Sequence, residues 1–312
     1  MAQAGTPAGT QAGTQAGTQT GTPDALTSFP DWGAPVRDAT NALVEWLVLR
    51  FGDGFEAFSN TLLALLMGLE QLLRGAPPWV VLLATAALAF GASRSLLLAL
   101  ASAAGLWLIG ALGQWEQALQ TLALVLVSVA LCLGLGLPLG VWSARSGWVR
   151  RIVLPLMDLM QTIPSFVYLI PAAMLFGLGK VPAILATVIY AAPPLIRLTD
   201  LGIREVGVDA VEAARAFGAT RWQLLTKVQI PLSLPAIMQG INQTTMMALA
   251  MVVVASMIGA RGVGETVLVG LQRNDPGTGL VGGLVIVIMA IVLDRMLQSY
   301  GRRLQTHRDA RG

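Results

Sequence analysis

The chain has 312 residues, of which 55% are hydrophobic and 12% are charged, and its mean hydropathy is +0.68. Soluble domains carry about 25% charged residues, so this composition excludes an ordinary soluble protein and predicts an all-α, polytopic membrane protein. The formal net charge of +3 is too small to indicate a nucleic-acid partner.

The residues that several kinds of enzyme site need are missing. The one cysteine, Cys132, lies in an apolar run, and the one histidine, His307, lies in a polar tail. These counts exclude a histidine-built metal site and a Cys–His or Ser–His–Asp catalytic set. The sequence has no phosphate-binding loop, because Gly179-Lys180 lacks the upstream glycine and the following hydroxyl. We therefore expect no catalytic residue, no metal and no cofactor on this chain.

The N-terminal region divides into two parts before the long apolar runs begin. Residues 1–23 repeat Ala-Gly-Thr-Gln, which predicts a disordered, low-complexity tail. Residues 24–76 contain apolar stretches at 42–51 and 55–73 that carry too many charges to span a bilayer easily. We expect this second part to form an amphipathic, interfacial region on the outer side of the membrane.

Residues 77–300 form the predicted transmembrane domain, because their apolar runs are long enough to cross a bilayer. We expect about seven transmembrane helices, with only a short polar break between the first two. The expected ranges are 79–94, 95–112, 118–142, 153–177, 181–200, 235–259 and 278–298.

The basic residues predict how these spans are oriented. With the N-terminus outside, six of the 20 Lys and Arg residues lie on the outer side and the remaining fourteen on the inner side, as the positive-inside rule requires. This orientation puts the loop 201–231 and the C-terminal tail 301–312 in the cytoplasm. The outer six are Arg37, Arg50, Arg74, Lys180, Arg261 and Arg273.

A polar segment, Asp209–Pro231, separates two apolar spans and contains two predicted short helices. We expect Asp209 to cap the first helix at Ala210, with Glu212 completing a capping box. Gly218 is expected to end that helix in the left-handed conformation.

The second short helix of this segment has its own start signal. Thr220 and Gln223 have the spacing of a capping box. We expect Pro231 to end the polar segment just before the next span. The first helix also carries one carboxylate beside two alanines, so another protein surface could approach its backbone closely.

The same segment resembles the EAA loop of permease subunits of ATP-binding-cassette importers. In that family, the loop docks into a groove on the ATPase subunit and transmits its closure to the membrane helices. A cytoplasmic loop without a partner is the alternative interpretation. The residues that carry the resemblance, and that it implies as the ATPase-coupling site, are Glu212, Ala213, Ala214, Gly218, Val228, Ile230 and Pro231.

Longer stretches between about 121 and 298 resemble the permease of glycine betaine/proline betaine/choline importers. They are MDLMQTIPSFVYLIP at 157–171, AAPPLIRLTDLGIREV at 191–206, INQTTMMALAMVVVASMIGARGVG at 241–264 and IVIMAIVLDR at 286–295. This resemblance implies the ABC importer permease fold in the plasma (inner) membrane. The implied partners are a second permease copy, two ATPase subunits that bind the ATP, an extracytoplasmic substrate-binding protein and the surrounding membrane lipids. The implied activity is uptake of a quaternary ammonium osmolyte by alternating access.

Polar side chains inside the spans are further candidates, because burying them in a bilayer is costly. Asp158, Gln161 and Thr162 share one helix face and could line a translocation pathway. Alternatively, Asp158 lies near the cytoplasmic end of its span and pairs with an arginine such as Arg150 or Arg151.

The sixth expected span carries Asn242, Gln243 and Thr244. These side chains could line a polar pathway, or they could form hydrogen bonds between neighbouring helices. The glycines at 134, 136 and 140 predict close helix packing, and those in 259–264 predict an irregular turn before a short helix at 265–273.

Three other functions stay open on the sequence alone. The importer could carry another small solute, such as choline alone, carnitine or another zwitterion. A secondary transporter could use Asp158 as its ion-coupling site, and a membrane-anchor protein could use the loop as a scaffold.

Overall fold

The computed structural model describes the backbone of residues 32–309 and the side chains as far as Arg303. The chain divides into two compact units, residues 1–43 and 44–312. In the first unit, a helix begins at Gly33, and the Thr40 hydroxyl donates a hydrogen bond of 2.7 Å to the Val36 carbonyl. The predicted disorder of residues 1–23 lies outside the described residues. All further contacts belong to the second unit.

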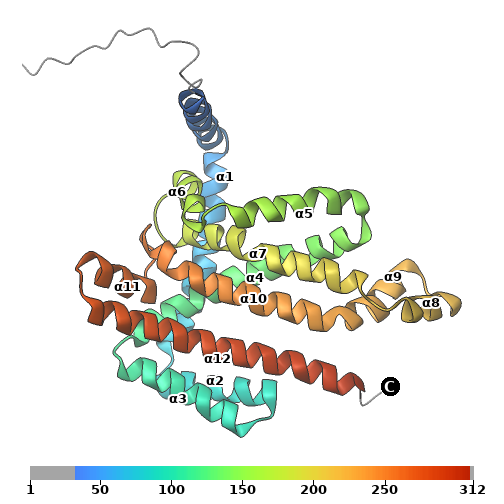
Figure 1. The fold of residues 1–312 in the computed structure, drawn as a ribbon. Helices are drawn as coiled ribbons and strands as arrows, with labels where there is room; N and C mark the ends of the chain where they lie inside the picture. Colours follow the sequence, from blue (N-terminus) through green and yellow to red (C-terminus); the bar gives the residue numbers. More distant parts are fainter. Residues whose placement is uncertain (1–31, 310–312) are drawn as a thin grey trace, which may run out of the picture. The chain divides into compact units, whose positions relative to one another are not determined.

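The described part of the chain is helical and contains no β-strand, which confirms the predicted all-α fold (Figure 1). Most elements are α-helices; η1 is a short 3₁₀ helix and η2 is a π-helix. Their bounds are α1 Gly33–Gly75, α2 Pro78–Ser93, α3 Leu96–Ala111, α4 Trp115–Arg145, α5 Gly147–Thr162, η1 Ser165–Tyr168, α6 Leu169–Phe176, α7 Lys180–Arg204, α8 Val208–Ala216, α9 Arg221–Leu224, η2 Leu225–Gln229, α10 Ile230–Ser256, α11 Val263–Gln272 and α12 Pro276–Asp309.

Four helical segments are long and apolar enough to cross a membrane, and the number rises to six if each of two sharply bent helix pairs forms one span. By length and composition, the described helices thus give fewer candidate spans than the expected number of about seven. The difference lies first in α2 and α3, which have 16 residues each. At 1.5 Å per residue, each is about 24 Å long, short of the roughly 30 Å hydrocarbon core. They pack against each other as a helical hairpin.

The N-terminal amphipathic region forms one long helix in the structure. The two expected stretches at 42–51 and 55–73 are parts of one continuous helix, α1. Near the end of α1, Leu62 and Leu66 are buried in the main hydrophobic core of the second unit. The outer-side position of this region stays a prediction.

The span expected at 153–177 is broken, and its two halves are bent by 107°. Ile163 has an extended backbone conformation, as the residue before Pro164 prefers. Because proline lacks an N–H group, the Met160 carbonyl loses its helical donor at this point. The Tyr168 hydroxyl replaces that donor with a hydrogen bond of 2.6 Å to the Met160 carbonyl. The break therefore leaves the Met160 carbonyl with a hydrogen-bond donor, and the helix is interrupted here and not only kinked.

Helix α7 lies between α4 and α10 and is the most buried of the candidate spans (Figure 1). The three helices approach one another at small residues. A methyl group added to Gly140 would lie 2.7 Å from Thr199 Cβ, and one added to Gly202 would lie 2.6 Å from Ala236 Cβ. These contacts confirm the predicted packing role of Gly140, whereas Gly134 has open space around it.

The irregular turn after α10 and the short helix α11 agree with the sequence prediction. Gly259 and Gly262 have φ values of 86° and 148°, in the region that favours glycine. The Val263 N–H donates a hydrogen bond of 2.9 Å to the Thr121 hydroxyl, which holds the start of α11 against α4. At the start of α12, hydrogen bonds from the Thr278 hydroxyl and backbone N–H hold the pKa of Asp275 below its ordinary value.

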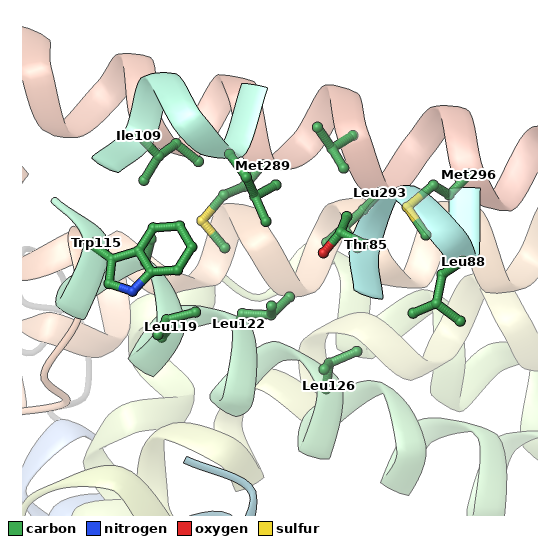
Figure 2. Close-up of a pocket in the computed structure, with 13 residues that line it drawn as sticks. Thr85, Leu88, Ile109, Trp115, Leu119, Leu122, Leu126, Met289, Leu293 and Met296 are labelled. Carbon is green, nitrogen blue, oxygen red and sulfur yellow. The ribbon is translucent and has the colours of Figure 1, made fainter. Parts of the chain in front are cut away.

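The α2–α3 hairpin, α4 and α12 enclose a cavity of about 200 Å³, here called the apolar cavity (Figure 2). Its lining is almost entirely leucine, isoleucine, valine, alanine, methionine and Trp115, with one hydroxyl from Thr85. In the close-up, Ile109 and Trp115 lie toward one end of this cavity, and Leu88 and Met296 toward the other.

Two glycines of α4 give a matched test of this packing. We expect Gly140→Ala to lower the thermal stability of the detergent-purified chain, because its methyl group overlaps Thr199 and costs about 1–3 kcal/mol. Gly134→Ala makes the same chemical change with nothing within 4 Å and should leave the unfolding temperature unchanged or higher. Thermal unfolding curves measure both, and equal effects of the two variants would contradict the close α4–α7 contact.

Candidate functional site

The polar segment between α7 and α10 folds into the two expected short helices, but the first one starts differently. Helix α8 begins at Val208 with Gly207 as its N-cap, and no side chain caps it. The predicted capping box of Asp209 and Glu212 is therefore wrong. Asp209 lies within the first turn instead, where its negative charge interacts favourably with the positive end of the helix dipole.

The other two local signals of this segment are confirmed. Gly218 has a φ of 78° and ends α8, and the Ala219 N–H donates a hydrogen bond of 3.0 Å to the Ala214 carbonyl. In α9, the Thr220 hydroxyl accepts from the Gln223 N–H, while the Gln223 side chain accepts from the Thr220 N–H. The sharp turn between α8 and α9 is thus fixed at both of its ends.

Pro231 does not end the polar segment, contrary to the prediction. It lies in the first turn of α10, and helix runs on from Arg221 to Ser256, over 36 residues. The π-helix η2 precedes it, and there the Ile230 N–H bonds to the Leu225 carbonyl. A π-turn accommodates the missing proline N–H without breaking the helix, because the hydrogen-bond pattern shifts by one residue. The loop is consequently joined to α10 by uninterrupted helix.

The turn between α8 and α9 is exposed and unusually apolar. Phe217, at the turn, is 93% exposed and Trp222, in α9, is 68% exposed, while Val208, at the opposite end of α8, is 67% exposed. Glu212 and Ala213 are also exposed, whereas Ala214, Val228, Ile230 and Pro231 are half-buried. We call Val208, Glu212, Ala213, Phe217, Gly218 and Trp222 the loop surface. Large apolar side chains gathered on an exposed turn are typical of a protein-binding surface.

The charged residues between α5 and α7 pair differently from the prediction. Asp158 forms an ion pair with Arg197 of α7, so Arg150 and Arg151 were the wrong partners. Arg150 instead lies 3.4 Å from the carboxylate of Asp200, which is buried and also lies 3.6 Å from Arg204. Sequence reasoning missed Asp200. Gln161 and Thr162 are exposed on α5 beyond this group.

The polar residues of α10 face different neighbours. The Asn242 side chain donates a hydrogen bond of 2.8 Å to Asp294 of α12, and Gln298 donates one of 2.7 Å to the same oxygen. The Thr244 hydroxyl donates to the Ala191 carbonyl of α7 at 2.8 Å, whereas Gln243 is exposed. Asn242 and Thr244 thus hold helices together, which is one of the two roles the sequence left open. Asp294 was not found from sequence.

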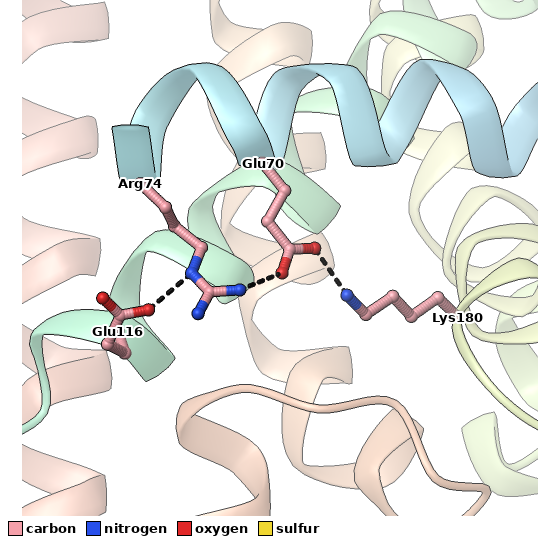
Figure 3. A network of polar contacts seen from close by, with 4 residues as sticks. All are labelled: Glu70, Arg74, Glu116 and Lys180. Atoms are coloured by element: carbon pink, nitrogen blue, oxygen red, sulfur yellow. Dashed lines mark hydrogen bonds and ion pairs between the residues drawn. The ribbon is translucent and has the colours of Figure 1, made fainter. Parts of the chain in front are cut away.

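A network of four charged side chains, here called the Glu70 network, joins the end of α1 to the starts of α4 and α7 (Figure 3). Its members are Glu70, Arg74, Glu116 and Lys180. The carboxylate of Glu70 is buried and lies 2.5 Å from the Lys180 ammonium and 3.3 Å from the Arg74 guanidinium. Arg74 also lies 2.5 Å from Glu116. Among the side chains that the structure describes, which end at Arg303, no group of three or more His, Cys, Asp or Glu could hold a metal ion.

The comparison with known proteins identifies the family. Residues 136–306 match the model of the binding-protein-dependent transport system inner membrane component. The chain belongs to this family. It is accordingly a multi-pass inner-membrane component of a transport system, and the match covers the end of α4, all of α5 to α11 and most of α12.

Two relatives and one solved structure extend this result. The chain is 49% identical over 83% of its length to the glycine betaine/proline betaine transport system permease protein ProW of Escherichia coli (strain K12), covering 73% of that protein. It is 45% identical over 85% of its length to the glycine betaine transport system permease protein OpuAB of Bacillus subtilis (strain 168), covering 94%. A structure of the inward-facing MetNI methionine ABC transporter superposes with a TM-score of 0.51 and 26% identity, over 60% of this chain and 92% of that one.

The Glu70 network gives a test with a control on the same helix. We expect Glu70→Gln to lower the stability of the purified chain by about 1–3 kcal/mol, because Lys180 and Arg74 lose their shared counter-charge. Glu56→Gln removes an exposed carboxylate from α1 and should change stability by less than about 0.5 kcal/mol. Thermal unfolding measures both variants. An unfolding temperature of Glu70→Gln equal to that of the wild type would show that the network does not stabilise the chain.

Proposed function

We propose that this chain is the transmembrane subunit of an ATP-binding-cassette importer that takes up a quaternary ammonium osmolyte such as glycine betaine. The observation that carries the proposal is the match to the transport family together with high identity to two glycine betaine permeases along most of the chain. The exposed loop surface, on helices that run directly into the membrane domain, supports the importer class.

In this proposal, the loop surface binds a separate ATPase subunit. Glu212, Ala213 and Ala214 lie on α8, Gly218 ends it, and Phe217 and Trp222 supply apolar anchors beside them. ATP bound by the partner closes the ATPase dimer and moves the α8–α9 turn. Because Arg221–Ser256 is helical without interruption, the displacement of the turn reaches the middle of the membrane domain as a movement of α10.

The proposed orientation places the N-terminus outside and the C-terminus and the loop surface in the cytoplasm. The uneven distribution of the Lys and Arg residues supports it, since fourteen of 20 lie at the proposed inner side. A second copy of the chain would complete the translocation pathway, and an extracytoplasmic binding protein would deliver the solute. Selective recognition of the cation would then belong mainly to that binding protein, and the permease needs only weak solute contacts.

The secondary-transporter alternative has less support from the same contacts. Its coupling carboxylate would be Asp158, but this side chain is 62% exposed and already paired with Arg197. An ion-coupling carboxylate is expected to lie inside the helix bundle, where its protonation or ion binding changes the local electrostatics strongly.

A substitution at Gly218 tests the coupling role. In the left-handed conformation, Gly218→Ala is strained by about 1–2 kcal/mol, which should disturb the α8–α9 turn and lower coupled uptake about tenfold. Gly207→Ala, at the other end of α8, has a φ of −49° and no atom within 4 Å, so uptake should stay near wild type. Uptake and ATP hydrolysis are measured in vesicles that contain the coexpressed complex, and wild-type uptake in Gly218→Ala would refute the coupling role.

Transport itself tests the class and the solute. Vesicles that contain this chain with its coexpressed ATPase and binding protein should accumulate labelled glycine betaine when ATP is supplied and not when the binding protein is left out. Labelled choline and carnitine, measured in parallel, rank the solutes. Accumulation driven by an ion gradient without ATP would overturn the importer class. Stimulated ATP hydrolysis without uptake of any of the three would overturn only the solute.

A further inference from the structure

A second pocket lies next to the apolar cavity and has the opposite chemistry. It has a volume of about 570 Å³ and lies where the α2–α3 turn meets the last turns of α12. Four guanidinium groups line it, from Arg94, Arg295, Arg302 and Arg303. No carboxylate is among the side chains that the structure assigns to its lining. We call it the arginine pocket, and its charge indicates an anionic ligand.

The backbone of the α2–α3 turn adds to this charge arrangement. Arg303 donates a hydrogen bond to the Gly91 carbonyl near the end of α2, so one carbonyl that would repel an anion is already occupied. The N-cap of α3, Ser95, makes no side-chain hydrogen bond to the first turn of that helix. The Ser95 N–H donates a hydrogen bond of 3.0 Å to the Ser93 hydroxyl, but the N–H groups of the first turn of α3 have no acceptor in the Ser95 side chain. The positive end of the α3 dipole therefore lies at the pocket, whose lining includes Ser95 and Leu98.

Arg94 occupies a costly backbone position in this turn. Its φ is 53°, a left-handed conformation in which glycine and asparagine are the usual residues. Helix packing alone does not require an arginine there, because the hydrogen bond that closes α2 comes from the Arg94 backbone N–H to the Phe90 carbonyl. The side chain is exposed and lines the arginine pocket.

The apolar cavity and the arginine pocket follow each other along the same two helices. On α12, Met289, Leu293 and Met296 line the cavity, and the arginines from Arg295 to Arg303 line the pocket. On α2, the order is the same, from Leu88 to the turn at Arg94. Figure 2 shows Leu88 and Met296 at the same end of the cavity, and on their helices these are the cavity-lining residues closest to Arg94 and Arg302. We call these two neighbouring pockets together the groove, which is apolar at one end and cationic at the other.

We propose that this groove binds an anionic phospholipid, with a segment of one acyl chain in the apolar cavity and the headgroup phosphate in the arginine pocket. A free phosphate would need only the cationic part, whereas a lipid uses both parts. The neighbouring surface also suits a lipid, since Leu96, Leu97 and Leu100 of α3 are at least 60% exposed. Basic pockets between membrane helices are suited to anionic headgroups because several arginines can contact one phosphate.

The binding test uses the purified full-length chain in neutral detergent, with dioleoyl phosphatidylglycerol, dioleoyl phosphatidylcholine and inorganic phosphate as probes. Native mass spectrometry should show retention of phosphatidylglycerol well above phosphatidylcholine. Arg94→Asn and Arg295→Gln should each weaken phosphatidylglycerol binding about fivefold. Asparagine is chosen at 94 because it tolerates the left-handed backbone. Arg145→Gln is the matched control, since it removes one exposed arginine at the end of α4, outside the pocket.

The acyl-chain position has its own readout in Trp115, which lines the apolar cavity. Phosphatidylglycerol with brominated acyl chains should quench tryptophan fluorescence more in the wild type than in Trp115→Phe. Equal binding of the two lipids, or an equal loss in Arg145→Gln, would overturn the proposal. Displacement of phosphatidylglycerol by equimolar inorganic phosphate would overturn it in favour of a soluble anion site. None of these readouts depends on which solute is transported.

Discussion

The close contact of α7 with α4 and α10 is the constraint on which the rest of the membrane domain depends. Lipid tails are as apolar as leucine, so helices gain little from burying apolar surface against one another in a bilayer. They associate through close van der Waals packing and hydrogen bonds, which small residues permit. Gly140, Gly202 and Gly240 supply the space along α7, and Thr244 adds a hydrogen bond to the Ala191 carbonyl.

The elements around this centre show two ways of placing proline in a membrane helix. Pro164 ends α5, and the freed carbonyl of Met160 receives a hydroxyl from Tyr168 in the next segment. Pro231 follows the π-turn η2, and the helix continues. In one place the chain bends by 107°, and in the other the helix continues from Arg221 to Ser256, with the hydrogen-bond pattern shifted by one residue at η2. At the break, the Tyr168 hydroxyl satisfies the freed carbonyl, as a low-dielectric surrounding requires.

The sequence predicted the local features that depend on residues close in the chain. It did not predict the contacts that form between residues on different helices. The capping box of Thr220 and Gln223, the left-handed Gly218 and the helix after Gly262 each follow from residues close in the chain. The pairing of Asp158 with Arg197, by contrast, depends on how α5 lies against α7 after the break. Glu70, Asp200 and Asp294 were missed for the same reason, because their partners on other helices give no local pattern. Helix α8 begins two residues before its predicted start, with Gly207 as its N-cap in place of Asp209. Aspartate is favoured as an N-cap, but glycine is also common there, so the sequence did not distinguish the two.

Glu70 contacts both cations of its network, whereas Arg74 has two carboxylates to choose from, and this difference predicts how the four positions vary among related chains. It accepts from both Lys180 and Arg74, while Arg74 has a second carboxylate in Glu116. If either cation is replaced by a neutral residue, the buried Glu70 carboxylate keeps one positive neighbour. Substitution of one cation position at a time is therefore tolerated. The carboxylate has no such substitute, because its loss leaves the Lys180 ammonium facing the interior without an anion. Among homologous chains, position 70 should therefore vary least of the four, and changes at 74 and 180 should rarely occur together.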